Sequence, residues 1–390
     1  MRRVLVVIQT PTFGGPHNQV LRLHQPLRRR GWDMEALLPQ ESGTGAERLQ
    51  RAGIPVFRVP MCRLRRTARP QAQLQQWRHA LAGVTSIRAV IADRSPDVVM
   101  VCGLMTIQGA FAAHGLGTPI VWQLLSTFAP KPLRAVLAPF VRRWAHAVMS
   151  TGVETARQHP GIGEARAIPF FPPVQLDEWR CDATRRAAAR ARLGIPADAV
   201  LVGTVGNCNR QKAHERFVEV AASLRASDPK TRFCVFGAGT AGQAEYYDRE
   251  VIARARRYGL TDDGVMQFVD AGEDLASLIH AVDVFVLTSR AEGMPTALLE
   301  AMTAGIPAVA MNVGSVAEAI VNGRTGFVVP ANDLNGVTRS VRALVRDRGL
   351  MSTMGAAAAA RAHAEFSSER CADRHVDAFS QALHRAHCSH

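Results

Sequence analysis

Short apolar runs alternate with amphipathic stretches along most of the 390-residue chain. Most runs are near-continuous Val, Ile and Leu, as expected of parallel strands buried on both faces. The stretches between them have the periodicity of helices. The runs lie at 4–8, 34–38, 56–59, 98–102, 120–124 and 147–150 in the first half, and at 201–205, 233–236, 266–269, 284–288, 308–311 and 327–329 in the second. This strand–helix alternation predicts doubly wound α/β domains.

The same pattern divides the chain into two domains of similar size. Three prolines suit an extended connector near residues 168–179. We therefore predict an N-terminal, acceptor-binding domain at 1–172, a C-terminal, donor-binding domain at 173–365, and a C-terminal helix at 366–390 that packs back on the N-terminal domain. Since ligands bind at the carboxyl ends of parallel strands, two Rossmann-like domains facing each other across a cleft would enclose one site.

Charge is distributed unevenly between the two halves. Residues 1–175 hold 22 Lys+Arg against 8 Asp+Glu, whereas residues 176–390 hold 25 of each, so the first half carries the whole net charge of +14. Its arginines cluster at 28–30, within 63–69, and at 134, 142 and 143. Such a field favours an anionic partner, namely a lipid headgroup surface, an acidic acceptor or nucleic acid. A basic face that is merely solvated is the alternative.

The composition predicts neither a membrane span nor a disulfide framework. The longest uncharged stretch, 98–130, is broken by glycines and fits a buried strand and a helix better than a span. The seven cysteines are odd in number and lack C-x-x-C spacing, which argues against disulfides or zinc and for a reducing compartment. We expect a cytoplasmic protein, with peripheral contact to the inner membrane face through its basic half.

Glycine turns after predicted strands allow close approach to a ligand. Gly14 and Gly15 follow the first strand and precede a helix, whose N-terminus favours an anion, although the turn lacks the dinucleotide fingerprint. In GTVGNCNRQKAHERF, residues 203–217, a similar turn leads to Lys212 at a predicted helix start. Lys212 is one of only three lysines, and an ammonium there suits a phosphate clamp. A plain turn and a solvated lysine are the alternatives.

Two glutamates flank a predicted helix start in RAEGMPTALLEAMTAGIPAVA, residues 290–310. A strand leads into the loop that carries Glu292, and Pro295 suits the first helical turn. Glu300 shares a helix face of small residues with Thr296. Carboxylates accept hydrogen bonds from vicinal hydroxyls, and loop N–H groups between them can face phosphates. The spacing therefore fits a nucleotide sugar.

These motifs resemble those of the retaining glycosyltransferases of family four, which have the GT-B fold. Glu292 and Glu300 match the E-x₇-E motif of that family. AVDVFVLTSRAEGMPTALLEAMTAGIPAVA matches its core signature almost throughout, and GSVAEAIVNGRTGFVVPANDL matches the segment that follows. VGNCNRQKAHERF matches its phosphate-binding strand–loop–helix, and FGGPHNQ its first loop. The resemblance covers nearly the whole chain.

The resemblance implies a set of site residues. By it, Lys212 contacts the donor diphosphate, Glu300 holds the nucleotide ribose and Glu292 holds the donor sugar. Glu292 and Lys212 are the expected catalytic residues. The expected donor-binding residues are Gly14, Gly15, Asn207, Arg210, Lys212, Gly293, Met294, Pro295, Thr296 and Glu300. It also implies a reaction that retains configuration and needs neither metal nor cofactor.

Two positions depart from the family's pattern. Many members carry an arginine where this chain has Asn207, so Arg210 would have to supply that cation, and many have a histidine where this chain has Leu125. We expect a hexosyltransferase that uses a nucleotide-diphosphate sugar, with a UDP-sugar favoured, and an acceptor that is lipid-linked or anionic. Another GT-B enzyme, such as a nucleotide-sugar epimerase, is the alternative. A nucleic-acid-binding protein is disfavoured because no nucleic-acid motif is present.

Overall fold

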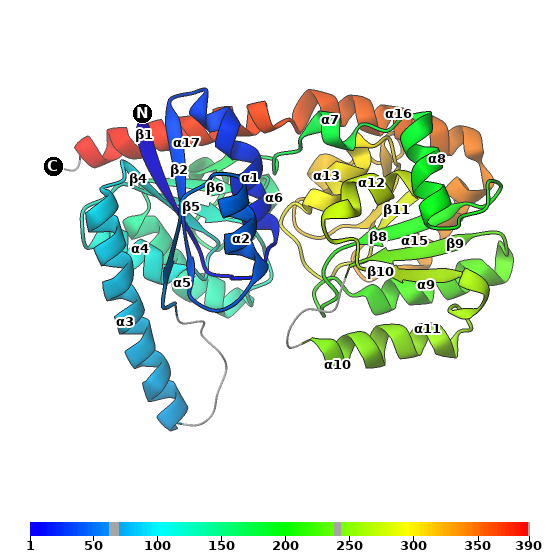
Figure 1. Ribbon diagram of the computed structural model, residues 1–390, viewed down its shortest axis with the longest axis horizontal. Coiled ribbons are helices and arrows are strands. Elements are labelled where there is room, and N and C mark those ends of the chain that lie inside the picture. Colours follow the sequence, from blue (N-terminus) through cyan, green and yellow to red (C-terminus); the bar gives the residue numbers. More distant parts are fainter. Residues whose placement is uncertain (62–69, 238–242, 389–390) are drawn as a thin grey trace. The chain divides into compact units, whose positions relative to one another are not determined.

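The computed structural model describes residues 1–61, 70–237 and 243–388, and the chain divides into two compact units (Figure 1). The first unit comprises Met1–Pro173 with Ser368–His390, and the second comprises Val174–Ser367. Each is built on a parallel sheet with helices, as the alternation of apolar runs and helical stretches predicts.

In the first unit, the strands of the described residues lie in the order β3-β2-β1-β4-β5-β6-β7, and every pair is parallel. They are β1 (Arg2–Ile8), β2 (Trp32–Pro39), β3 (Val56–Val59), β4 (Val98–Cys102), β5 (Ile120–Leu124), β6 (Ala147–Ser150) and β7 (Ala167–Pro169). The strand order reverses between β1 and β4. That reversal is a topological switch point, where ligands bind in doubly wound sheets.

The last of these strands, β7, is absent from our sequence prediction. The proline-rich stretch from residue 168 reads as an extended connector, but Ala167–Pro169 pairs with β6 at the edge of the sheet. An edge position tolerates proline because the strand pairs on one side only. The N–H of Phe170 continues the pairing by donating to the Ser150 carbonyl at 2.9 Å. The predicted connector therefore begins with an edge strand before the chain passes into the second unit at Val174.

Helices cover both faces of this sheet, because successive β1 side chains point to opposite faces. Val4, Val6 and Ile8 pack with one set of helices, and Leu5 and Val7 with the other. The first set is α1 (Gly15–Arg28), α2 (Thr44–Arg51) and α17 (Ser368–His387). The second is α3 (Pro70–Arg94), α4 (Ile107–His114) and α5 (Lys131–Trp144). A short α6 (Val153–Arg157) and a 3₁₀ turn (Glu164–Arg166) precede β7.

A buried polar network joins α17 to α1 and β5 within the first unit. The His375 Nε2 accepts from the amides of Gln19 on α1, at 3.0 Å, and Gln123 on β5, at 2.9 Å. Its Nδ1 lies 2.8 Å from the Cys371 carbonyl, the donor contact of a neutral ring. Burial lowers the pKa of His375 to about 4, so the ring is neutral at neutral pH.

The second unit repeats the architecture, with its described strands in the order β10-β9-β8-β11-β12-β13, all parallel. They are β8 (Leu201–Val205), β9 (Arg232–Phe236), β10 (Met266–Val269), β11 (Val284–Leu287), β12 (Ala308–Met311) and β13 (Gly326–Val329). Here the order reverses between β8 and β11. The second switch point therefore lies between those two strands.

One face of the second sheet packs against α9, α11, α15 and α16, and α13 contacts β11 and β12. The helices of this unit are α7 (Leu176–Trp179), α8 (Ala183–Arg192), α9 (His214–Ser227), α10 (Ala244–Tyr246), α11 (Ala253–Arg257), α12 (Leu275–Leu278), α13 (Thr296–Thr303), α14 (Val316–Ala319), α15 (Leu334–Arg346) and α16 (Arg348–Glu365). A π-helical turn (Tyr247–Ile252) joins α10 to α11, and 3₁₀ turns lie at Asp262–Gly264, Gly272–Asp274 and Ile279–Ala281. Among the described residues, none of the helices combines the length and apolar character needed to cross a bilayer.

Candidate active site

Two loops meet at the switch point of the second unit. One follows β8 and spans residues 206–213, and the other follows β11 and spans residues 288–295. Because β8 and β11 are adjacent and parallel, with Val202 opposite Val284, their carboxyl ends lie at the same edge of the sheet. The loops carry Lys212 and Glu292, which are 80 residues apart in sequence.

Lys212 and Glu292 form an ion pair across the two loops. The Lys212 Nζ lies 2.8 Å from the Glu292 Oε1, and their side chains are 20% and 7% exposed. Hydrogen bonds hold the loops in register beside this pair: the Gln211 amide donates to the Ala291 carbonyl at 2.9 Å, and the N–H of Arg290 donates to the Gln211 carbonyl at 2.8 Å. The structure thus brings the two predicted catalytic residues together.

The first loop is shaped by Asn209 and Ala213. The Asn209 Oδ1 accepts hydrogen bonds at 3.0 Å from the N–H groups of Gln211 and Lys212. Ala213 adopts a left-handed conformation (φ 54°), which alanine adopts only at a cost, and α9 begins after it. Lys212 therefore precedes the helix by two residues and does not lie at the helix start that the sequence predicts.

Beneath this loop, Cys208 and His214 form a buried pair. The Cys208 Sγ lies 2.9 Å from the His214 Nδ1. Burial, together with the nearby Lys212 charge, lowers the pKa of His214 to about 3, and burial raises the pKa of Cys208 to about 12. A neutral thiol and a neutral imidazole therefore hold the base of the loop.

The second loop is fixed by a close approach of backbone. Gly314 lies in the loop after β12 with φ +56°, and a Cβ there would come within 2.4 Å of the Glu292 carbonyl oxygen. The N–H of the next residue, Ser315, donates to the Gly293 carbonyl at 2.8 Å. Only glycine permits this contact, which sets the backbone of Glu292 and Gly293.

Helix α13 begins immediately after this loop. Pro295 is the residue that caps it (φ −71°, ψ 118°), so the helix starts at Thr296, one residue later than the sequence suggests. Met294, which precedes Pro295 in the loop, is buried. Glu300 lies within α13 and, like Glu292, is buried.

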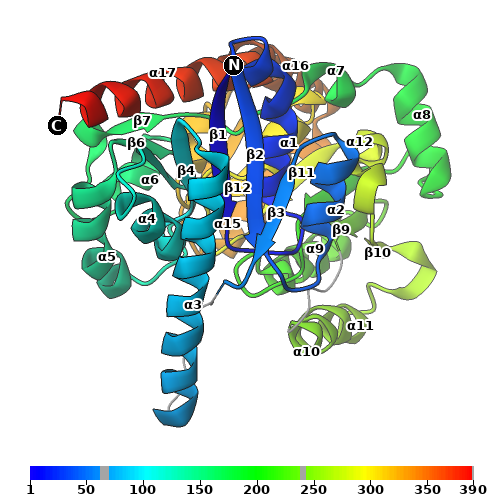
Figure 2. The ribbon, with the colours of Figure 1, turned by 60° about the vertical axis from the view of Figure 1, so that its left-hand side comes forward.

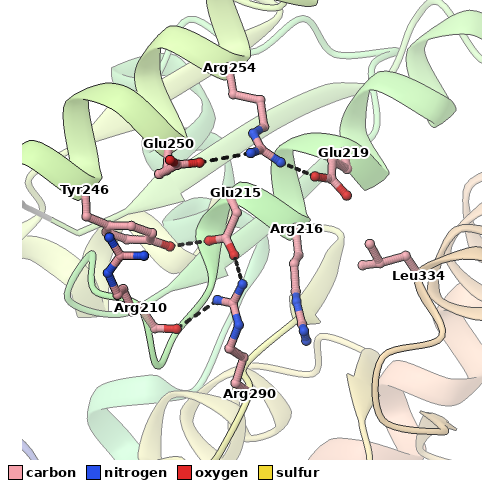
Figure 3. Close-up of a pocket in the computed structure, with 9 residues that line it drawn as sticks. All are labelled: Arg210, Glu215, Arg216, Glu219, Tyr246, Glu250, Arg254, Arg290 and Leu334. Atoms are coloured by element: carbon pink, nitrogen blue, oxygen red, sulfur yellow. Dashed lines mark hydrogen bonds and ion pairs between the residues drawn. The ribbon is translucent and has the colours of Figure 1, made fainter.

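A second network, which sequence reasoning missed, braces the loops from α9. The Arg290 guanidinium lies 2.5 Å from the Glu215 Oε1 and donates to the Arg210 carbonyl at 2.9 Å (Figure 3). The other Glu215 oxygen accepts from the Tyr246 hydroxyl, and burial, with this carboxylate, raises the pKa of Tyr246. These partners are scattered along the sequence, so no local motif indicates the network.

The same residues line a pocket of about 270 Å³ on the second unit (Figure 3). The Arg210 guanidinium lies over the Tyr246 ring in this pocket, 5.4 Å from its centroid. Asn207 is exposed on the same loop as Arg210. The arginine that the sequence suggests as a second cation for a diphosphate therefore stacks on an aromatic ring. The lining residues are Arg210, Glu215, Arg216, Glu219, Tyr246, Glu250, Arg254, Arg290 and Leu334.

In the first unit, the loop after β1 leads directly into α1. Gly14 is extended (φ −167°) and precedes the helix, which starts at the exposed Gly15. A Cβ added at Gly15 would meet nothing within 4 Å. His17 is buried just behind, and burial lowers its pKa to about 4. Leu125 is partly buried against the core on the same side as α1.

Within residues 1–61, 70–237 and 243–388, no group of three or more His, Cys, Asp or Glu side chains is arranged to hold a metal ion. The cysteines that the structure describes are free: Cys102, Cys181, Cys208, Cys234, Cys371 and Cys388.

Both units match glycosyltransferase family models. The model described as "Glycosyl transferases group 1" matches residues 185–361, and that described as "Glycosyl transferase 4-like domain" matches residues 14–169. The two models thus place both units among the glycosyltransferases. The chain belongs to the group 1 glycosyltransferases, of the family-four type that the sequence motifs predict.

Curated relatives agree with this assignment. The chain is 33% identical over 297 residues to the D-inositol 3-phosphate glycosyltransferase of Streptomyces avermitilis, a match that covers 70% of this chain and 63% of that protein. The protein of the same name from Geodermatophilus obscurus is 34% identical over 250 residues, covering 61% and 53%. The chain thus spans less than two thirds of the length of these relatives.

Solved structures confirm the predicted GT-B fold. The structure of Anabaena Alr3699/HepE in complex with UDP-glucose has a TM-score of 0.82 at 19% identity and covers 97% of this chain and 100% of that one. Sucrose-phosphate synthase from Thermosynechococcus elongatus has a TM-score of 0.78 at 20% identity, covering 98% and 100%. At such low identity the likeness is one of fold.

Proposed function

We propose that the chain transfers a hexosyl unit from a nucleotide-diphosphate sugar to an acceptor hydroxyl, with retention of anomeric configuration. The observation that carries this proposal is the Lys212–Glu292 pair, 2.8 Å apart at the switch point between β8 and β11. An ammonium held there can contact the diphosphate of the donor, and a carboxylate held there can accept hydrogen bonds from its sugar. Membership of the group 1 glycosyltransferases supports the same reaction.

In this proposal each candidate residue meets one part of the donor. Lys212 binds the diphosphate, and Glu292, with the backbone of Gly293–Thr296, binds the sugar. Glu300 binds the ribose. Gly14 and Gly15 offer backbone N–H groups to phosphate at the start of α1, while Asn207 and Arg210 are further donor-binding candidates. For Arg210 to meet phosphate, its guanidinium would leave the Tyr246 ring.

The chemistry proposed for these residues is electrostatic. As the sugar leaves, negative charge grows on the departing diphosphate, and the Lys212 ammonium offsets it. Preorganised charges of this kind are worth several kcal/mol because they do not reorganise during the reaction. Glu292 holds the ammonium in place, and its carboxylate accepts hydrogen bonds from hydroxyls of the sugar. No protein nucleophile or metal is invoked.

The donor that we propose is a UDP-sugar, which the Anabaena complex with UDP-glucose supports. For the acceptor we propose an anionic molecule, lipid-linked at the cytoplasmic face of a membrane, because the first half carries the whole net charge. A small soluble metabolite is the competing acceptor. Of the arginines on which the sequence argument rests, Arg142 and Arg143 are exposed. Of the other clustered arginines, Arg134 is buried and Arg29 and Arg30 pair with Glu369. The cluster of Arg63, Arg65, Arg66 and Arg69 lies outside the described residues.

Calorimetry and product analysis test the proposal. We expect UDP to bind more tightly than GDP or ADP, and NMR of the product from a UDP-hexose to show the anomeric configuration of the donor. An inverted product would contradict retention. Release of an epimerised nucleotide sugar would identify an epimerase instead, and failure to bind any nucleoside diphosphate would reject the donor site.

A further inference from the structure

Helices α4 and α5 of the first unit leave large apolar side chains in solvent. They contact each other and lie side by side in both views (Figures 1 and 2). Val136 on α5 is 63% exposed, Phe140 on α5 is 38% exposed and Phe111 on α4 is 41% exposed. Phe128, just before α5, is 62% exposed. Such side chains normally pack against something.

These side chains form a connected surface, which we call the α4–α5 face and define by Phe111, Val136, Phe140 and Trp144. The Trp144 ring lies 5.6 Å from the Phe111 ring and 5.0 Å from the Phe140 ring, measured between centroids. On α5, Val136 and Phe140 are one turn apart and therefore project on the same side of the helix. The surface is thus continuous from one helix to the next.

The charged residues of α4 and α5 themselves are all basic. The chain has no Asp or Glu between Asp97 and Glu154, a span that includes both helices. Lys131 at the start of α5 and Arg142 and Arg143 at its end are exposed. Arg88 on α3 adds a guanidinium 5.5 Å from the centroid of the Phe111 ring. Apolar side chains that project between basic ones are typical of helices lying in the interface of an anionic bilayer.

We propose that the α4–α5 face docks on an anionic lipid bilayer, with Val136, Phe140 and Trp144 entering the headgroup region and Lys131, Arg142 and Arg143 contacting lipid phosphates. A second copy of the chain would oppose two acid-free, basic surfaces, which repel each other. An anionic bilayer instead offers both an apolar interior and negatively charged headgroups. The inference rests on the proposed function in one respect, namely that the acceptor is presented at a membrane.

Vesicle co-sedimentation tests the docking. Vesicles of phosphatidylcholine alone are compared with vesicles of phosphatidylcholine and phosphatidylglycerol in equal parts, at low and high salt. We expect binding to the anionic vesicles that weakens with salt, because exposed charges are screened beyond about 8–10 Å. The charge variant Arg142→Gln/Arg143→Gln should bind roughly thirtyfold more weakly. The apolar variant Val136→Ser/Phe140→Ser should keep its salt dependence and lose affinity at all salt concentrations.

The second unit offers a matched control. Arg256, Arg257 and Tyr258 are consecutive exposed residues there, two basic and one aromatic. The variant Arg256→Gln/Arg257→Gln/Tyr258→Ser should bind vesicles like the parent protein. Brominated lipid should quench the fluorescence of the parent protein more than that of Trp144→Phe. Circular dichroism and UDP calorimetry on each variant check the fold and the donor site.

Several outcomes would overturn the docking. One is absence of binding to anionic vesicles at low salt, and another is equal binding to both vesicle types. A third is a loss of vesicle affinity in the second-unit control variant equal to that in the variants of the α4–α5 face. A dimer that the apolar variant dissociates would assign the face to a second copy of the chain instead. Vesicle binding is measured without donor, so its failure alongside intact UDP binding rejects the docking alone. The opposite result rejects the proposed function alone.

Discussion

The switch point of the second unit carries a charged pair, whereas that of the first unit carries a glycine turn. After β8 and β11, Lys212 and Glu292 are joined at 2.8 Å, and the hydrogen bonds of Gln211 and Arg290 hold their loops together. After β1, Gly14 and Gly15 lead into α1 and present backbone alone. Two sheets with the same parallel topology thus offer different chemistry, because the loops at the strand ends carry the functional groups.

The two halves of the chain also differ in the balance of their basic and acidic residues. The second half balances its charges, 25 against 25, and uses many of them in specific pairs such as Arg290–Glu215. The first half has 22 basic residues against 8 acidic ones, and some of its arginines, such as Arg29 and Arg30, pair with Glu369 of α17. A surplus of positive charge of this kind attracts anions in general.

The Lys212→Ala variant should have the largest effect on transfer, because it removes the cation that distinguishes the second switch point from the first. Loss of a charge-assisted phosphate contact costs about 1.5–3 kcal/mol, so transfer should fall by roughly 10- to 150-fold or more. The Glu292 carboxylate would then stand against the diphosphate without its partner. Turnover and UDP affinity measure the effect, and a melting curve reports on the fold.

Lys230→Ala is the matched control, because Lys230 is an exposed lysine of the same unit paired with Asp198 at 2.9 Å. We expect it to leave transfer and UDP affinity unchanged. Near-parental turnover of a well-folded Lys212→Ala protein would remove Lys212 from the donor site.

The sequence predicts the fold better than it predicts the local geometry of the site. Apolar runs indicate all the described strands but β7, because strands buried on both faces leave a strong hydrophobic signal, whereas Ala167–Pro169 is short and ends in proline. The motifs predict the family, which the family models confirm. The left-handed Ala213, which places Lys212 before α9, has no such signal because it depends on packing.

The partners of Arg290 are likewise invisible in the sequence. Glu215 and Tyr246 become neighbours of Arg290 only when α9 and α10 pack beside the loop after β11. Such contacts follow from tertiary structure, and no helical or strand period relates the three positions. The roles of the site residues, including Glu300, stay predictions that the following variants test.

The two glutamates should separate binding from turnover. Glu300→Gln should weaken UDP binding about tenfold, through loss of charge-assisted bonds to the ribose. Glu292→Gln should lower turnover by a similar factor and change UDP affinity less, because UDP lacks the sugar. Calorimetry with UDP and steady-state kinetics with a UDP-sugar give the two quantities. A larger loss of UDP affinity in Glu292→Gln than in Glu300→Gln would reverse the two assignments.

Arg290→Ala tests whether contacts with α9 hold the two loops of the second switch point in position. The variant removes the cation 2.5 Å from the buried Glu215 and the bond to the Arg210 carbonyl. We expect a several-fold rise in the KM for the donor, because the two loops lose register, and a stability loss of about 1–3 kcal/mol from the unpaired carboxylate.

Tyr246→Phe controls for that stability loss. It removes one hydrogen bond to Glu215 but leaves Arg290 in place. Stability should fall while the KM for the donor stays near the parental value. If the two variants raise KM equally, Arg290 acts through general stability and not through the position of the loops.

Gly15→Ala tests whether the first switch point contributes to the donor site at all. An added Cβ would meet nothing within 4 Å, and the residue opens α1, so the variant should fold and gain up to about 1 kcal/mol of helix propensity. If phosphate approaches the Gly15 backbone closely, the methyl group will crowd it and weaken UDP binding a few-fold. Uridine, which has no phosphate, is the control ligand and should bind both proteins equally. Equal UDP affinity and turnover in parent and variant would confine donor recognition to the second unit, with its Lys212–Glu292 pair as the anionic-ligand site of the chain.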